Sequence, residues 1–114
     1  MTQTVTMYRP CGEAELKLVE ASGFTAWPPR LPEQPIFYPV TSLEYAEEVN
    51  NWNVRQFGKG YVTRFEVEKT FADRYPIKTV GASRHTEWWI PAEDLDALNT
   101  SIVGKIAVIS ERSA

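Results

Sequence analysis

The chain has 114 residues, a net charge of −3 and a single cysteine. This length predicts one domain over residues 1–114, and 43% apolar with 24% charged residues is typical of a folded globular protein rather than a disordered one. The acidic balance does not indicate a nucleic-acid partner. Because Cys11 is the only cysteine, the chain cannot form an internal disulfide, and no second cysteine is present to bind a metal with it. No apolar run is long enough for a membrane span and no secretion signal is visible, so we expect a cytoplasmic protein without a membrane partner.

The first third of the chain predicts a strand, a helix and a long loop. Residues 4–9 are rich in Thr, Val and Tyr, which favour a strand, and residues 13–22 have helical spacing with Gly23 placed to end the helix. Residues 24–35 are dense in proline, which predicts an irregular surface loop. Such a loop either serves a site or is a rigid connector, and both interpretations stay open.

A second strand and helix are expected next. Residues 36–40 have the pattern of a short buried strand, and Thr41 and Glu44 have the spacing of a capping box at a helix start. Three apolar residues then follow at helical spacing and predict one buried face: Tyr45, Val49 and Trp52. The pattern breaks over residues 50–60, for which we predict a loop.

The second half predicts mainly strands. The expected elements are a half-exposed strand at 61–68, a helical turn within 69–75, a strand at 77–80, an alternating strand at 84–90, a helix from 91 to 98 and a closing strand at 104–110. Together these elements predict an α+β fold with a mixed, largely antiparallel sheet and a few short helices.

Glu87, His85 and Trp89 alternate along the strand at 84–90 and therefore share one of its faces. A carboxylate is costly to bury among aromatic rings unless it is hydrogen-bonded or binds a ligand, and a partly dry carboxylate can stabilise positive charge on a sugar carbon. The alternative is an exposed edge-strand glutamate with the tryptophans in the core. His85, the only histidine, is a candidate acid, base or ligand-positioning donor, or else a structural group.

Arg9 ends the first predicted strand and would point inward with Val5 and Met7. Its planar guanidinium suits a phosphate or a carboxylate, and the alternative is an ion pair with a nearby acid. Trp27 and Trp89 are the two tryptophans that we expect to line a pocket.

The order of these elements resembles the ADP-ribosyltransferase fold. The matching pieces are Met7-Tyr8-Arg9, the helix that closes at Gly23-Phe24, the strand at 36–40 leading into Tyr45-Ala46, the block Glu87-Trp88-Trp89-Ile90-Pro91 and the final strand at 106–109. The chain also resembles a group of small bacterial proteins of uncharacterised function that share the YRP, PPRLPEQPIFYPV, GYVTRFEV, EWWIPAE and IVGKI blocks and are called "ADP-ribosylation/crystallin J1". The second half of that name denotes an all-helical hydrolase, which this strand-rich pattern does not support.

The resemblance implies NAD, or a related nucleotide, as the bound cofactor. Arg9 would contact the ribose or phosphate side of NAD, and Tyr38 would support the nicotinamide pocket. Tyr8 and Trp89 are further candidates for binding the cofactor. Glu87 would hold a ribose hydroxyl and stabilise the oxocarbenium-like transition state. The Ser-Thr-Ser motif of arginine-modifying members is absent, and His85 stands where those members carry Glu or Gln, so the implied acceptor is not arginine.

Two other functions remain open from the sequence. One is a non-catalytic module that binds a protein partner through the proline-rich loop and Trp27. The other is a nucleotide-sugar hydrolase or lyase that uses His85 and Glu87 as an acid–base pair in the same pocket.

Overall fold

The computed structural model describes residues 3–80 and 85–113. Their elements, in chain order, are β1 (Thr4–Cys11), α1 (Glu13–Ala21), β2 (Ile36–Phe37), α2 (Leu43–Phe57), β3 (Lys59–Glu68), α3 (Lys69–Ala72), β4 (Ile77–Thr79), β5 (Thr86–Trp88), β6 (Ile90–Pro91), a 3-10 turn (Ala92–Asp94), α4 (Leu95–Thr100) and β7 (Ile102–Ser113). None of the described helices is both long and apolar enough to cross a bilayer.

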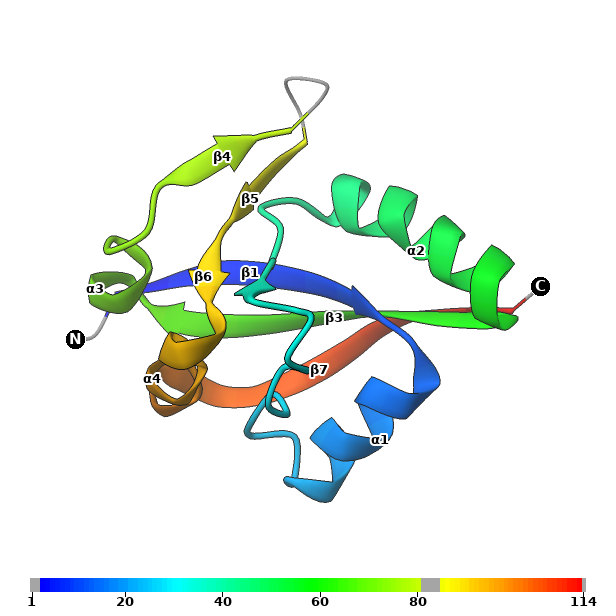
Figure 1. Ribbon diagram of the computed structural model, residues 1–114, viewed down its shortest axis with the longest axis horizontal. Coiled ribbons are helices and arrows are strands. Elements are labelled where there is room, and N and C mark those ends of the chain that lie inside the picture. The colour runs from blue at the N-terminus through cyan, green and yellow to red at the C-terminus, as the bar shows by residue number, and fades with distance from the viewer. Residues whose placement is uncertain (1–2, 81–84, 114) are drawn as a thin grey trace.

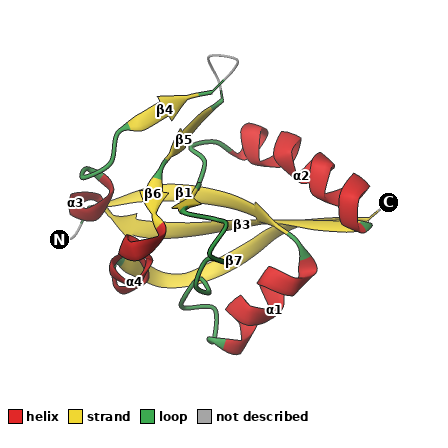
Figure 2. Ribbon diagram, viewed as in Figure 1, coloured by secondary structure: helices red, strands yellow, loops and turns green. Residues whose placement is uncertain are grey.

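Three antiparallel strands in the order β1-β3-β7 form the main sheet (Figure 1). Two smaller antiparallel strand pairs, β2 with β6 and β4 with β5, lie beside the main sheet (Figure 2). Val40 connects the two parts, since it forms isolated antiparallel bridges to Tyr8 of β1 and to Glu87 of β5. The predicted α+β fold with antiparallel sheets and a few short helices is therefore confirmed.

The main sheet has a different cluster of apolar side chains on each face. In Figure 1, α2 lies above the right-hand end of the strands and α1 lies below it. Tyr8 packs on the α2 side, against the buried cluster of Val40, Tyr45, Ala46 and Val62. Met7, one residue earlier and so on the opposite face, belongs to the larger core, whose bulkiest members are Trp27, Phe37, Phe65 and Trp88.

The second helix differs from the prediction at both ends. Its N-cap is Ser42, whose side chain accepts a hydrogen bond from the Tyr45 backbone N–H at 3.2 Å, so the capping box from Thr41 to Glu44 is wrong. The loop expected over 50–60 is wrong as well, because α2 continues to Phe57 and ends at Gly58, which has a φ of 82°.

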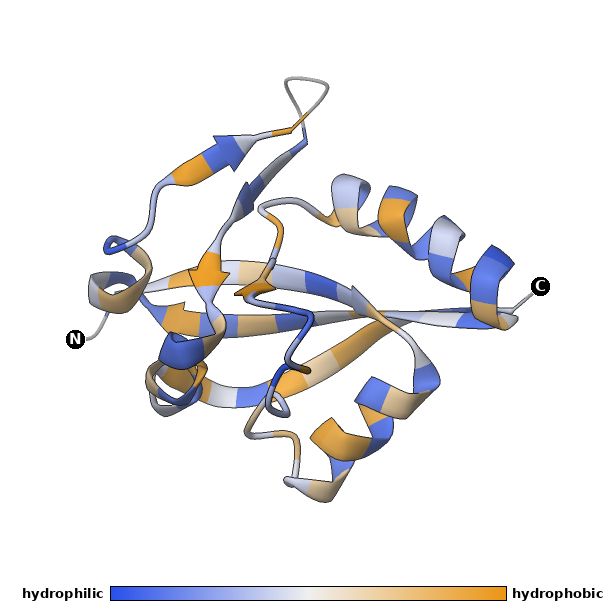
Figure 3. Cartoon of the chain, in the orientation of Figure 1, coloured by the Kyte–Doolittle hydropathy of each residue, from blue (hydrophilic) through white to orange (hydrophobic). Residues whose placement is uncertain are grey.

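Burial of two amides explains why α2 continues. Asn50 and Asn53 are buried on the face of the helix that carries Ala46. Trp52 lies two turns after Tyr45 on the predicted face but is 55% exposed, so its expected burial was wrong. Hydrophilic and hydrophobic residues alternate along α2 in Figure 3. Packing of this face onto β1 and β3 overrides the low helix propensity of asparagine.

The other elements follow the predictions with shifted ends. Residues 24–35 form neither helix nor strand, as expected. The strand expected at 36–40 is only β2, because Pro39 has no N–H to donate to a ladder. The strand expected at 84–90 is divided into β5 and β6 at Trp89, and its residue 84 lies outside the described residues. The closing strand is longer than 104–110.

Candidate functional site

Glu87 is buried, with 8% of its surface exposed, and both of its carboxylate oxygens accept hydrogen bonds. The Tyr45 hydroxyl donates to Oε2 at 2.9 Å and the Trp89 indole Nε1–H donates to Oε1 at 2.7 Å. The alternative of an exposed edge-strand glutamate is therefore wrong. Burial raises the pKa of Tyr45 to about 12, and the hydrogen bond to Glu87 adds to the rise because the carboxylate favours the protonated phenol.

Three other candidate residues are linked to this carboxylate, Trp89 directly and His85 and Tyr38 through its two hydrogen-bond donors. The His85 ring stacks on Tyr45 with ring centroids 4.6 Å apart, and its Nε2 lies 2.5 Å from a carboxylate oxygen of Glu48. Trp89 is 41% exposed, and its ring packs edge to face against the Tyr38 ring, with centroids 6.0 Å apart. We call Glu87, Tyr45, His85, Trp89 and Tyr38 the Glu87 cluster.

Arg9 lies on the other face of the sheet from the Glu87 cluster. Tyr8, Val40 and Glu87 are paired directly across neighbouring antiparallel segments, so their side chains share one face. Arg9 follows Tyr8 in β1 and points to the opposite face. The structure therefore brings Glu87 together with His85, Trp89 and Tyr38 but not with Arg9. Tyr8 packs against an apolar cluster that includes Tyr45, on the same side of the sheet as Glu87.

The Arg9 guanidinium forms a two-point ion pair with Glu15 of α1. Arg9 Nε and Nη2 donate to the two Glu15 oxygens at 2.7 and 2.9 Å. The same guanidinium lies over the Phe37 ring, 4.4 Å from its centroid, and 5.6 Å from that of Trp27. Trp27 is only 2% exposed and belongs to the core, so the prediction that it lines a pocket or a docking surface was wrong.

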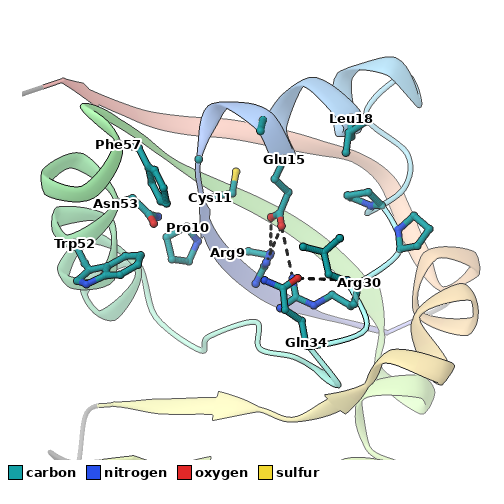
Figure 4. Close-up of a pocket in the computed structure, with 15 residues that line it drawn as sticks. Arg9, Pro10, Cys11, Glu15, Leu18, Arg30, Gln34, Trp52, Asn53 and Phe57 are labelled. Atoms are coloured by element: carbon teal, nitrogen blue, oxygen red, sulfur yellow. Dashed lines mark hydrogen bonds and ion pairs between the residues drawn. The ribbon is translucent and has the colours of Figure 1, made fainter.

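A hollow of about 610 Å³ opens beside this ion pair, within the range of small-molecule sites (Figure 4). We call it the Arg9 hollow. It is formed by the end of β1, the first turns of α1, the proline-rich loop and the last turns of α2. The residues that line it are Arg9, Pro10, Cys11, Gly12, Ala14, Glu15, Leu18, Pro28, Pro29, Arg30, Leu31, Gln34, Trp52, Asn53 and Phe57. Glu87 and the rest of its cluster line neither this hollow nor a second one between α3 and α4.

Sequence reasoning missed Arg30, a second arginine in the wall of the Arg9 hollow. Its side chain is 10% exposed, and its Nη1 lies 3.7 Å from a Glu15 oxygen that Arg9 also contacts. The Arg30 Nε is buried and has no hydrogen-bond partner among the described residues. Burial lowers the pKa of Arg30, and the neighbouring positive charge of Arg9 lowers it further. The available signal was an arginine between prolines in a loop suspected of serving a site.

The floor and rim of the Arg9 hollow have different character. Cys11, in the floor, is buried, and this burial together with the Glu15 charge raises the pKa of its thiol to about 12. Gly12 precedes α1 and offers no side-chain cap, so the positive end of this helix borders the hollow. At the rim, Trp52 and Phe57 form an exposed edge-to-face pair with centroids 6.0 Å apart.

This arrangement suits an anion that carries an apolar or aromatic group. Within residues 3–80 and 85–113, no three His, Cys, Asp or Glu side chains are grouped so as to hold a metal ion.

Comparison with known proteins does not identify a family for this chain. No family model matches it, and no curated protein sequence matches it.

Proposed function

We propose that this protein is an ADP-ribosyltransferase-like nucleotide-binding protein that holds NAD, or a related nucleotide, in the Arg9 hollow. One observation carries the proposal: two mostly buried guanidinium groups, Arg9 and Arg30, share the single carboxylate of Glu15 in the wall of a hollow of about 610 Å³. The site therefore has one positive charge more than its own carboxylate neutralises.

The shape of the Arg9 hollow supports a nucleotide more than a bare anion. The arginines lie at its inner wall, and the exposed rings of Trp52 and Phe57 lie at its rim, where a base or a nicotinamide ring would stack. The resemblance to ADP-ribosyltransferases independently assigns Arg9 to the ribose or phosphate side of NAD. Of the residues that the resemblance assigns to NAD, Arg9 lines the hollow, whereas Tyr38, Glu87 and Trp89 do not.

Transfer of ADP-ribose to a non-arginine acceptor is a separate proposal with less support from the geometry. The resemblance assigns the transfer step to Glu87, but that carboxylate is hydrogen-bonded at both oxygens and lies across the sheet from Arg9. For Glu87 to hold a ribose hydroxyl, the ligand would have to displace the Tyr45 or Trp89 donor. We therefore place binding first and treat transfer as a second question with its own assay.

Calorimetry on the folded chain tests binding. We expect heat on titration with NAD or ADP-ribose, and Arg30→Ala should weaken that binding by about tenfold or more, because a hydrogen bond to a charged group contributes roughly 1.5–3 kcal/mol. The matched control is Arg64→Met, which removes one positive charge from an exposed position of β3 outside the hollow. No heat at millimolar NAD would overturn the proposal.

Radiolabelled NAD added to a cell lysate tests transfer. Label on protein that disappears in Glu87→Gln would support transfer through Glu87, whereas release of nicotinamide without labelled protein would favour the nucleotide-sugar hydrolase or lyase. Absence of both reactions, with binding intact, would leave a non-catalytic ligand-binding module.

The exposed side chains at the rim favour one alternative from another class, a protein-binding module. Leu18, Leu31, Trp52 and Phe57 are all more than half exposed around the mouth of the hollow. An apolar rim of this kind is a common feature of docking surfaces. Binding of nucleotide that is unaffected by Trp52→Ala would favour this use of the rim.

A further inference from the structure

We propose that Arg30, and not Arg9, is the residue that grips the phosphate of the ligand, while Glu15 acts as a positioning residue that holds Arg9 in place. This inference rests on the proposed function for the class of ligand, a phosphate or diphosphate attached to an apolar or aromatic group. It reverses the roles that the sequence suggested, since Arg9 was the expected phosphate contact.

The donors of Arg9 are already engaged. Its Nε and Nη2 both donate to Glu15 in a two-point geometry, at 2.7 and 2.9 Å, which is the strongest arrangement for this pair of groups. Its flat face lies over Phe37 at 4.4 Å. A phosphate could take the two-point position on Arg9 only by displacing Glu15.

The donors of Arg30 are largely unused. Its contact with Glu15, at 3.7 Å, is longer than a hydrogen bond, and its buried Nε has no partner among the described residues. A guanidinium that is nine-tenths buried is costly to leave so poorly paired. A phosphate in the hollow would supply the missing acceptors, since its oxygens match the planar arrangement of the guanidinium donors.

The proline-rich loop holds Arg30 in position before any ligand arrives. Pro28 and Pro29 come directly before Arg30, and proline rings restrict the backbone angles of this segment. Trp27 anchors the loop: its backbone N–H donates to Asn99 Oδ1 at 2.8 Å, and Asn99 Nδ2 donates to the Trp27 carbonyl at 3.0 Å. A side chain presented from an anchored segment loses less conformational entropy on binding.

Glu15 determines how much positive charge remains for the ligand. Two guanidinium groups and one carboxylate leave one net positive charge, and Glu15→Gln leaves two while keeping the side chain's shape and length. We therefore expect Glu15→Gln to strengthen phosphate binding, which is the opposite of what loss of a merely structural contact would do.

The experiment is calorimetric titration of the intact chain with two probes, inorganic pyrophosphate and NAD. We expect Arg30→Ala to weaken both by about tenfold or more and Arg30→Lys, which keeps the charge but not the planar donors, to fall between. Glu15→Gln should strengthen pyrophosphate binding several-fold. Its matched control is Glu13→Gln, which removes the same charge from the same helix turn at an exposed side chain that does not line the hollow.

The outcomes separate this inference from the proposed function. NAD binding that is unchanged in Arg30→Ala and Arg30→Lys, or a Glu15→Gln variant that binds pyrophosphate more weakly, would overturn the inference and leave the function standing. Pyrophosphate binding that depends on Arg30, with no binding of NAD, would support the inference and overturn the function. A folded chain that binds neither probe would overturn both.

Discussion

Two mostly buried carboxylates, Glu15 of α1 and Glu87 of β5, are stabilised in different ways. Glu15 is paired with the charges of Arg9 and Arg30 at the edge of a hollow. Glu87 accepts hydrogen bonds from two neutral donors, Tyr45 and Trp89, within packed aromatic rings. Beside Glu15, Arg30 keeps hydrogen-bond donors without a partner among the described residues, and they border an open hollow. At Glu87, both carboxylate oxygens already accept hydrogen bonds.

The difference shows how to separate a binding site from a structural polar cluster. A buried carboxylate alone favours neither, because both glutamates meet that description. The deciding features are unpartnered donors and an adjoining hollow. Glu15 has both through Arg30, whereas Glu87 is hydrogen-bonded at both oxygens and lines neither of the two hollows described above. Five predictions test this contrast, in order of decreasing effect.

The largest expected effect is on the reactivity of Cys11, beside Glu15. A thiol with its pKa raised to about 12 has roughly 10³-fold less thiolate at pH 8 than one at its ordinary value of 9.0, so alkylation of the native protein should be at least ~10²-fold slower than that of the unfolded chain. Glu15→Gln should speed the reaction, because the Glu15 charge contributes to the raised pKa, and Glu87→Gln should not. Equal rates for native and unfolded protein at pH 8 would contradict this.

The same raised pKa determines how stability changes with pH. Because the folded thiol ionises at a higher pH than the unfolded thiol, Cys11 stabilises the fold fully below pH 9, and this contribution falls as the pH rises toward about 12. Denaturant unfolding of Cys11→Ser and the natural chain across this range would measure the difference, which should shrink with rising pH.

Glu87→Ala should have the largest effect on stability. Removing the carboxylate leaves the Tyr45 hydroxyl and the Trp89 indole N–H without their acceptor, and we expect a loss of about 3 kcal/mol from two hydrogen bonds to a charged group. Glu87→Gln, which keeps an acceptor oxygen, should lose less. Urea unfolding measures both variants; a loss below about 0.5 kcal/mol in Glu87→Ala would mean that the carboxylate is not held as a structural group.

Gly60→Ala should disturb only the half of α2 that borders the Arg9 hollow. An added Cβ would overlap the buried Asn50 Oδ1 and would lie 3.0 Å from the Cβ of Asn53. We expect a loss of about 2 kcal/mol from overpacking, together with weaker nucleotide binding. The control is Gly12→Ala, whose Cβ would meet nothing closer than Phe57 at 3.8 Å. It should cost no more than about 1 kcal/mol, the loss expected when alanine replaces glycine at a helix N-cap.

The smallest effect on stability is expected for Trp52→Ala. This side chain is 55% exposed, so unfolding free energy should change by less than about 0.5 kcal/mol. NAD binding should weaken about fivefold or more through loss of stacking, while pyrophosphate binding stays unchanged. Equal weakening of both probes would mean that Trp52 shapes the hollow instead of contacting the base.

Periodicity predicted the elements well where one face of each is apolar. The alternation of Tyr61, Thr63, Phe65 and Val67 identified β3, and the helix at 13–22 was right to within one residue. Prediction failed in the last turns of α2, because Asn50 and Asn53 do not look like core residues and are buried only through packing on β3. It failed again for Trp27, since nothing local to a proline-rich loop shows that the core will enclose its tryptophan.

The candidate site shows the same division. By itself, the sequence determined which groups are available for chemistry, namely Arg9, Glu87, His85 and a rigid loop between prolines, because charge, ring and backbone restriction belong to the residue types. Only the tertiary structure decided which groups meet. The bridges from Tyr8 through Val40 to Glu87 put Arg9 on one face of the sheet and Glu87 on the other, and the path of the proline-rich loop brought Arg30 to Glu15. Such pairings depend on strand register and on contacts between distant segments, which local residue patterns do not encode.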